Sequence, residues 1–104
     1  MSSIHTLTSA DGVRLHVRTS GSPGGRTILF VHGFALSQWC WKRQFEAPEL
    51  QCYRLVALDL RGHGRSDKPT QAIAYQSSDA WANDMATVIE GLALEKSIIV
   101  FWSY

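Results

Sequence analysis

The pattern of hydrophobic and polar residues changes near residue 27 of this 104-residue chain. Residues 5–10 and 13–19 each alternate between apolar and polar side chains, which is typical of strands buried on one face. Asp11 and Gly12 separate the two segments and form a dipeptide that is favoured in tight hairpin turns. The pattern predicts an antiparallel hairpin near one edge of a sheet.

Three continuous apolar runs follow, over residues 27–31, 54–58 and 97–101. Such runs, rich in β-branched residues, are typical of strands covered on both faces. Between the first two runs, residues 38–47 have a helical pattern that Pro48 ends. Between the second and third runs, apolar residues recur at helical spacing, at Trp81, Met85, Val88, Ile89 and Leu92. Ser77 or Ser78 is expected to cap the start of this helix.

Buried strands that alternate with helices imply right-handed crossovers between parallel strands. We therefore predict an α/β fold, with a mainly parallel sheet of about five strands, the N-terminal antiparallel hairpin and flanking helices. Residues 1–104 are expected to form a single partial domain, because this length fits no more than one modest unit.

The composition is that of an ordinary globular protein, with 45% hydrophobic and 18% charged residues. A net charge of +1 with scattered basic residues gives no reason to expect nucleic acid or a membrane as a partner. We find no signal-like N-terminus or membrane-length apolar run and expect a cytoplasmic location. Cys40 and Cys52 have no metal-type or redox-type spacing, so we expect buried, reduced thiols and no metal or cofactor.

Candidate chemistry lies in three loops that follow the apolar runs, since ligands of open α/β sheets bind beyond the carboxyl ends of the strands. These loops cover residues 32–34, 59–67 and 102–104. The segment Gly62-His63-Gly64 suggests a phosphate-binding loop, but Asp67 stands where a dinucleotide fingerprint needs its third glycine. Nucleotide binding is therefore the least favoured interpretation.

Three motifs in this order, FVHGF, LDLRGHGRSDKP and IIVFWSY, resemble the N-terminal part of an α/β-hydrolase of the haloperoxidase-like and esterase-like branch. The resemblance covers essentially the whole chain and ends at the nucleophile turn. It implies hydrolysis of a small ester-like carbonyl substrate by a serine nucleophile, or a cofactor-free perhydrolase or haloperoxidase-like reaction. Serine at that position argues against the aspartate-using epoxide hydrolase and haloalkane dehalogenase branches.

The resemblance assigns roles to five residues. Ser103 matches the nucleophile of the G-x-S-x-G turn, with an ordinary loop serine as the alternative. The backbone N–H groups of Phe34 and Tyr104 match the oxyanion hole. His32 is expected to shape the loop rather than to act as the base, which lies far downstream in the family. Gly33 avoids a side chain that would crowd the substrate.

The remaining loop residues and tryptophans have structural interpretations. Asp59, Arg61 and Asp67 are expected to brace the second loop, and His63 to shape its backbone or lie at the surface. Trp39, Trp41 and Trp81 are expected in the core or in helix packing, with Trp39 or Trp41 as a possible pocket wall. Trp102 is expected to help shape the pocket beside the nucleophile.

Two departures from the family pattern bear on activity. Phe101 occupies a position where the family has a small residue, and its ring is expected to overpack the turn. The family's catalytic acid and histidine do not occur in these residues, so we expect the chain to be inactive alone. Strand 97–101 is expected to be an exposed edge that lowers stability and permits self-association. The alternative is a non-catalytic remnant, or a fragment that needs a complementary chain.

Overall fold

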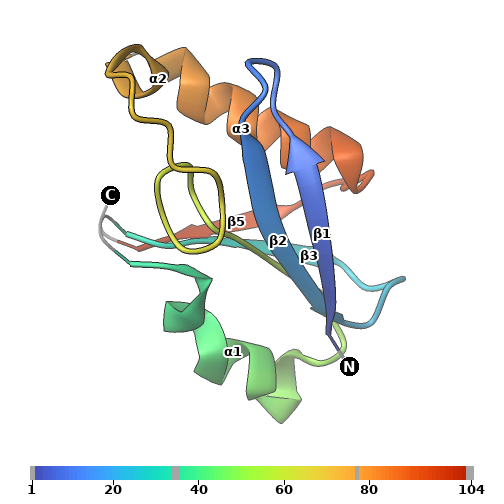
Figure 1. Ribbon diagram of the computed structural model, residues 1–104. Coiled ribbons are helices and arrows are strands. Elements are labelled where there is room, and N and C mark those ends of the chain that lie inside the picture. Colours follow the sequence, from blue (N-terminus) through green and yellow to red (C-terminus); the bar gives the residue numbers. More distant parts are fainter. Residues whose placement is uncertain (1, 34–35, 77, 103–104) are drawn as a thin grey trace.

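The computed structural model describes residues 2–33, 36–76 and 78–102. A sheet separates two helical layers, with α3 on one face and α1 on the other (Figure 1). The strands are β1 (Ser3–Thr8), β2 (Arg14–Gly21), β3 (Thr27–Val31), β4 (Arg54–Leu58) and β5 (Ile98–Phe101). The helices are η1 (Gln38–Trp41), α1 (Lys42–Glu46), η2 (Pro48–Leu50), α2 (Ile73–Gln76) and α3 (Ser78–Gly91).

The strands form one sheet in the order β1-β2-β4-β3-β5. β2 pairs antiparallel with both β1 and β4, while β3 pairs parallel with both β4 and β5. Among the described strands, β2 is thus the one that runs against the other four. The predicted α/β fold with an N-terminal hairpin is confirmed, and the sheet is mixed because β2 joins the hairpin to the parallel part.

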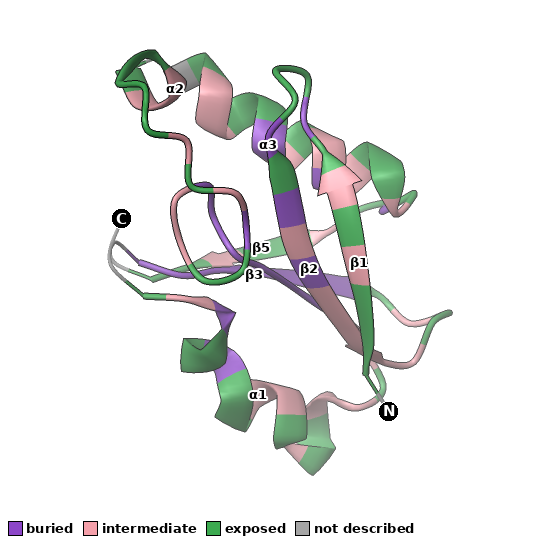
Figure 2. Ribbon diagram, viewed as in Figure 1, coloured by how far each residue is buried: buried purple, intermediate pink, exposed green. Residues whose placement is uncertain are grey.

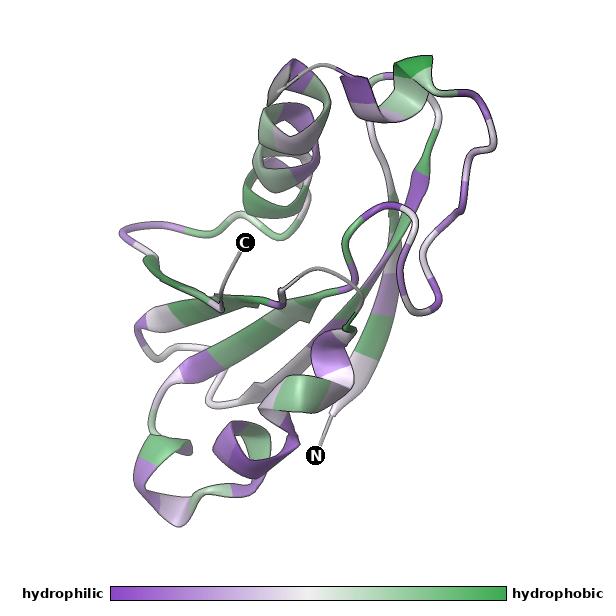
Figure 3. Ribbon diagram, turned by 90° about the vertical axis from the view of Figure 1, so that its left-hand side faces the viewer, coloured by the Kyte–Doolittle hydropathy of each residue, from purple (hydrophilic) through white to green (hydrophobic). Residues whose placement is uncertain are grey.

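Two apolar clusters hold the layers together, one on each face of the sheet. Successive side chains of a strand point to opposite faces, so Leu29 and Val31 join one cluster while Ile28 and Phe30 join the other. The first cluster packs under α3 and includes the inward residues of β2, and the second packs under η1 and α1. β3 is buried along its length (Figure 2), and the central strands carry mostly hydrophobic residues (Figure 3).

Strand β5 differs from β3 and β4, because it forms one edge of the described sheet. Its residues Ile98, Ile99 and Phe101 are 37%, 40% and 60% exposed. The run predicts a strand here, which is confirmed, and the expected exposure of this edge is also observed.

Three local predictions need correction or lie outside the described residues. The predicted helix over 38–47 is a 3-10 turn, η1, followed by the short helix α1, because Ser37 caps the turn and Asp59 holds its first N–H. Cys40 and Cys52 are exposed rather than buried, because one lies on the outer side of η1 and the other in the turn before β4. The expected Ser77 or Ser78 cap lies outside the described side chains.

Candidate active site

The loops that carry the predicted nucleophile and oxyanion hole begin at one edge of the sheet. β3 and β5 are parallel neighbours, and Val31 pairs with Phe101 at their carboxyl ends. The backbone N–H of Trp102 donates to the carbonyl of Val31 at 3.1 Å, which holds the chain beside β3 as it leaves β5. Trp102 is 57% exposed at this edge.

The structure does not describe three of the five predicted site residues. Ser103, Phe34 and Tyr104 lie outside the described residues, so their roles remain predictions. His32 and Gly33 are described, and both are buried directly after β3. The second loop, residues 59–67, follows β4 and contacts His32 and the segment that leads into η1.

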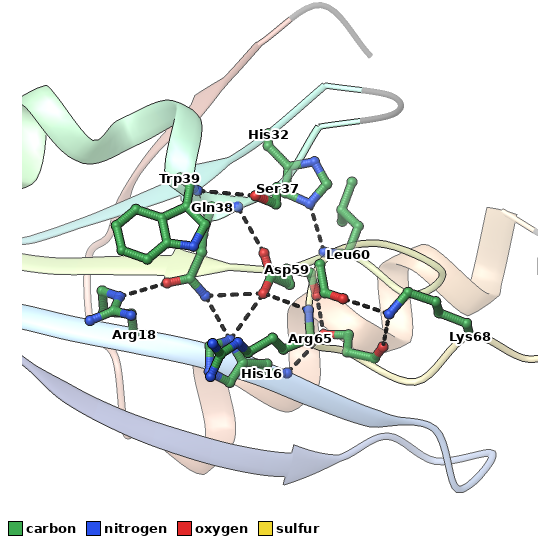
Figure 4. Close-up of polar contacts among 12 residues, drawn as sticks. His16, Arg18, His32, Ser37, Gln38, Trp39, Asp59, Leu60, Arg65 and Lys68 are labelled. Atoms are coloured by element: carbon green, nitrogen blue, oxygen red, sulfur yellow. Dashed lines mark hydrogen bonds and ion pairs between the residues drawn. The ribbon is translucent and has the colours of Figure 1, made fainter.

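Both ring nitrogens of His32 have partners, and one of them links the first loop to the second. Its Nε2 accepts the backbone N–H of Leu60 at 2.9 Å (Figure 4). Its Nδ1 lies 2.8 Å from the carbonyl of Gly33. A backbone N–H can only donate and a carbonyl can only accept, so the proton belongs on Nδ1. Burial is the main cause that lowers the pKa of His32 below its ordinary value, and the neutral ring leaves neither nitrogen available as a base.

The bond from His32 also restrains a backbone peptide. A peptide unit is planar and trans, so its N–H lies on the side opposite its carbonyl. The bond therefore restrains the direction of the Gly33 carbonyl, which belongs to the peptide unit that Gly33 begins. This is the unit whose N–H the resemblance assigns to the oxyanion hole.

Asp59 connects the second loop to η1 and β2 through its carboxylate, which is almost fully buried. Its Oδ1 accepts the backbone N–H of Gln38 at 2.7 Å, and its Oδ2 accepts the backbone N–H of Arg65 at 3.1 Å. His16 Nδ1 lies 3.0 Å from the same Oδ2 (Figure 4). Ser66 adds a link, because its hydroxyl donates to the Asp59 carbonyl at 2.5 Å and accepts the His16 N–H at 2.8 Å.

Arg61 is fully buried and all five of its guanidinium N–H groups have acceptors. The side chain makes a two-bond contact with Asp84 of α3, at 2.7 Å for both Nε and Nη2. It makes a second two-bond contact with Asp11 of the hairpin turn, at 2.8 and 3.1 Å. Nη1 also donates to the Ala74 carbonyl of α2 at 2.8 Å. These carboxylates raise the pKa of Arg61, and its bond to Asp11 lowers the pKa of that carboxyl.

Two glycines let the loop approach Asp59 and the neighbouring α2 segment. Gly62 and Gly64 have φ of +79° and +52°, in the left-handed region that favours glycine. A side chain at Gly64 would meet the Asp59 carboxylate, and one at Gly62 would meet the Tyr75 ring. The loop is therefore shaped for internal contacts, and no phosphate-binding role is needed to explain its glycines.

The bracing roles expected for the second loop agree with these contacts. Asp67 accepts from the backbone and side chain of Arg14, at 2.8 and 3.2 Å, and His63 Nδ1 lies 3.0 Å from the Arg61 carbonyl. Sequence reasoning missed Gln38 and Asp84. Asp84 did leave a signal, because it falls on the apolar stripe of α3 where a carboxylate requires a buried cation.

The described part of the chain shows no grouping of three or more His, Cys, Asp or Glu side chains suited to a metal ion. Its helices are also too short or too polar for any of them to cross a membrane. His32, Asp59, Arg61 and Ser66, with their hydrogen-bond partners, form a buried polar network that we call the polar frame.

Comparison with known proteins gives consistent matches. Residues 28–104 match the model of the "Alpha/beta hydrolase family". The structure of a putative aryl esterase from Burkholderia cenocepacia is 44% identical, with a TM-score of 0.95, covering 97% of this chain and 37% of that one. An epoxide hydrolase from Caballeronia sordidicola is 33% identical over 88% of this chain, and a non-heme chloroperoxidase from Streptomyces lividans is 34% identical over 89%. The chain spans 27% and 33% of the lengths of these two curated relatives.

Proposed function

Because the chain belongs to the alpha/beta hydrolase family, we propose that it contributes the nucleophile and oxyanion hole of a serine hydrolase acting on small esters or similar carbonyl compounds. The observation that carries the proposal is the pairing of Val31 with Phe101. It starts the loops leading to Phe34 and Ser103 from neighbouring parallel strands, where α/β folds bind their ligands.

In the proposed reaction, the Ser103 hydroxyl oxygen attacks the carbonyl carbon of the ester. The serine proton passes to a general base, and then to the alcohol oxygen as the carbon–oxygen bond to the leaving alcohol breaks. Water, deprotonated by the same base, then attacks the acyl-serine and releases the carboxylic acid and the free serine. In the family pattern, the base and its acid partner lie downstream of the nucleophile turn that Ser103 matches.

The frame described above supports the proposed oxyanion hole. His32 holds the Gly33 carbonyl, and so restrains the peptide whose N–H is assigned to stabilise the negative oxygen of the tetrahedral intermediate. Losing a donor of this kind typically raises the barrier by about 3 to 4 kcal/mol. Since both His32 nitrogens are engaged, we assign it a positioning role and not that of the base.

The names of the relatives favour hydrolysis but divide over the substrate, since they include an aryl esterase and an epoxide hydrolase. We favour an ester, because Ser103 stands where the epoxide hydrolase branch uses aspartate. The chloroperoxidase relative makes a cofactor-free perhydrolase-like reaction the second candidate at the same serine.

The competing proposal is a non-catalytic remnant, or a fragment that needs a complementary chain. Phe101 and the exposed side chains of β5 favour it, because the described residues cover the apolar surface of this strand only in part. On this proposal the chain has a folded frame but no turnover by itself.

A serine-directed probe separates the two proposals. The chain is mixed with the later segment of the aryl esterase relative, which supplies the base and acid in the family pattern, and is then incubated with a fluorophosphonate. The labelled peptide is identified by mass spectrometry, alongside p-nitrophenyl acetate turnover. Serine hydrolase chemistry predicts one adduct at Ser103, and loss of both adduct and turnover in Ser103→Ala. Ser3→Ala, on exposed β1, is the matched control. No adduct, or turnover unchanged in Ser103→Ala, would remove Ser103 from the mechanism and favour the non-catalytic proposal.

A further inference from the structure

A groove of about 340 Å³ lies between β2, β4 and the η1–α1 segment. Arg18 of β2 and Ala57 of β4 are register partners on its sheet side. Trp39, Trp41 and Phe45 line its helical side. Of the predicted site residues that the structure describes, neither His32 nor Gly33 lines it. Two strands of the sheet, β4 and β3, separate β2 from β5.

Arg18 is held in a fixed position at this groove but has no carboxylate partner among the described residues. Its Nε donates to Gln38 Oε1 at 2.8 Å and its Nη1 to Ser2 Oγ at 3.1 Å. Both partners are neutral, so the positive charge is oriented without being neutralised. Planar guanidinium groups bind carboxylates through two parallel hydrogen bonds. The Arg18 guanidinium, oriented and without a carboxylate partner among the described residues, is suited to bind a carboxylate in this way.

The helical side of the groove supplies a flat aromatic surface next to this charge. Trp39 is 59% exposed, and the Arg18 guanidinium carbon lies 5.2 Å from the centre of its ring. Trp41 is buried beneath and contacts Phe30 with ring centres 4.9 Å apart, which keeps the wall rigid. Lys42 adds a second cation, whose 3.8 Å pairing with Glu46 is exposed and therefore weak.

We propose that this groove binds a small, flat aromatic carboxylate. The carboxylate pairs with the Arg18 guanidinium, and the ring packs against Trp39. The volume falls within the range of small-molecule sites, roughly 300 to 1,000 Å³. The proposal does not depend on Ser103 or on any hydrolase activity.

The test is a titration of the whole chain with 2-naphthoate and, separately, with its neutral isostere 2-naphthamide, followed by tryptophan fluorescence and calorimetry. We expect saturable naphthoate binding. Arg18→Met should weaken it at least about tenfold, the loss of one charge-assisted contact, while Arg18→Lys should give an intermediate loss. Naphthamide should bind more weakly than naphthoate and should be affected little by Arg18→Met, which also shows that this variant is folded.

Trp39 and Trp102 provide a matched pair of controls, because their exposures are 59% and 57%. Trp39→Ala should weaken both ligands and remove most of the fluorescence change. Trp102→Ala should leave both affinities unchanged. Equal affinity for the acid and the amide, a response that depends on Trp102, or no saturable binding of naphthoate would each overturn the proposal.

Discussion

The loop after β4 and the carboxyl end of β5 lie at the same end of the sheet. They differ in how far the described residues bury their side chains and pair their polar groups. The loop is rich in charge, yet Asp59 and Arg61 are buried with their polar groups paired. β5 is almost entirely apolar, yet Ile99 and Phe101 are 40% and 60% exposed. In these two regions, a side chain is buried where the described residues offer it hydrogen-bonding or packing partners, whether it is charged or apolar.

This difference teaches which parts of the fold find their partners among the described residues. The polar frame uses acceptors and donors from the hairpin turn, η1, α2 and α3, all within this sequence. The apolar faces of β5 need surface that the described residues do not supply. The predictions below test the two regions against each other.

The largest effect should come from removing the buried cation of the loop. Arg61→Met leaves Asp84 buried without its partner, and we expect the free energy of unfolding to fall by about 3 to 5 kcal/mol, as measured by urea denaturation. Arg65→Met is the control, because Arg65 is exposed in the same loop and should change stability by less than about 0.5 kcal/mol. Equal losses in the two variants would contradict the bracing role of Arg61.

A smaller loss should follow from adding a methyl group at Gly64. Its φ of +52° and the Asp59 carboxylate that a side chain would meet predict that Gly64→Ala lowers stability by about 1 to 3 kcal/mol. Gly24→Ala is the matched control, since nothing lies within 4 Å of a side chain there. If both variants unfold at the same urea concentration as the parent, Asp59 is not held as the structure indicates.

Two substitutions at His32 separate the contributions of its two hydrogen bonds to stability. Asn can keep a donor near the Gly33 carbonyl but loses the acceptor for the Leu60 N–H, while Gln can keep that acceptor and loses the donor. Each variant should lose about 1 kcal/mol at pH 8, the typical net contribution of one hydrogen bond. Urea denaturation of both variants measures this loss.

The same variants should change how stability depends on pH. The pKa of His32 is lowered on folding from its ordinary 6.5, so the unfolded chain binds the proton more readily. Stability is then lost as pH falls below about 6.5, and this part of the slope should vanish in both variants. A slope between pH 8 and 5.5 that both variants retain would show that other groups cause it.

The smallest effect on stability, but a clear one on association, is expected at β5. We propose that its exposed edge pairs with a second copy, so that Ile99→Lys lowers the sedimentation-derived association constant several-fold while stability changes by less than about 0.5 kcal/mol. Ile4→Lys, on the opposite edge strand β1 and 49% exposed, is the control. A monomeric parent with a sharp cooperative melt would contradict both the association and the expected marginal stability.

The sequence predicted the strands better than the polar frame, for a physical reason. The bounds of β3 and β4 follow from short continuous apolar runs, a local signal, and both were predicted to the residue. The pairing of Arg61 with Asp84 joins residues 23 positions apart, and it can be recognised only once α3 lies over the sheet. For η1, the contact with Asp59 outweighed the helical pattern over 38–47.

The candidate site was predicted unevenly for the same reason. Motif spacing placed the loops of His32 and Ser103 at one sheet edge, and the register of Val31 with Phe101 agrees. Spacing could not reveal that His32 bridges to Leu60, because that bond depends on loop geometry. Nor could it place Arg18 beside Trp39, since those residues meet across two elements.

Because every N–H group of the Arg61 guanidinium has an acceptor, few substitutions of Arg61 and its partners should be tolerated during evolution. Its donors are shared between Asp11, Asp84 and the Ala74 carbonyl. A neutral residue at position 61 therefore leaves Asp84 buried without a cation and removes the partner of the more exposed Asp11. Replacing Asp84 alone leaves a buried cation short of acceptors. Positions 11, 61 and 84 should therefore change together or stay fixed during divergence, and a viable apolar replacement is expected to be a coordinated set of substitutions.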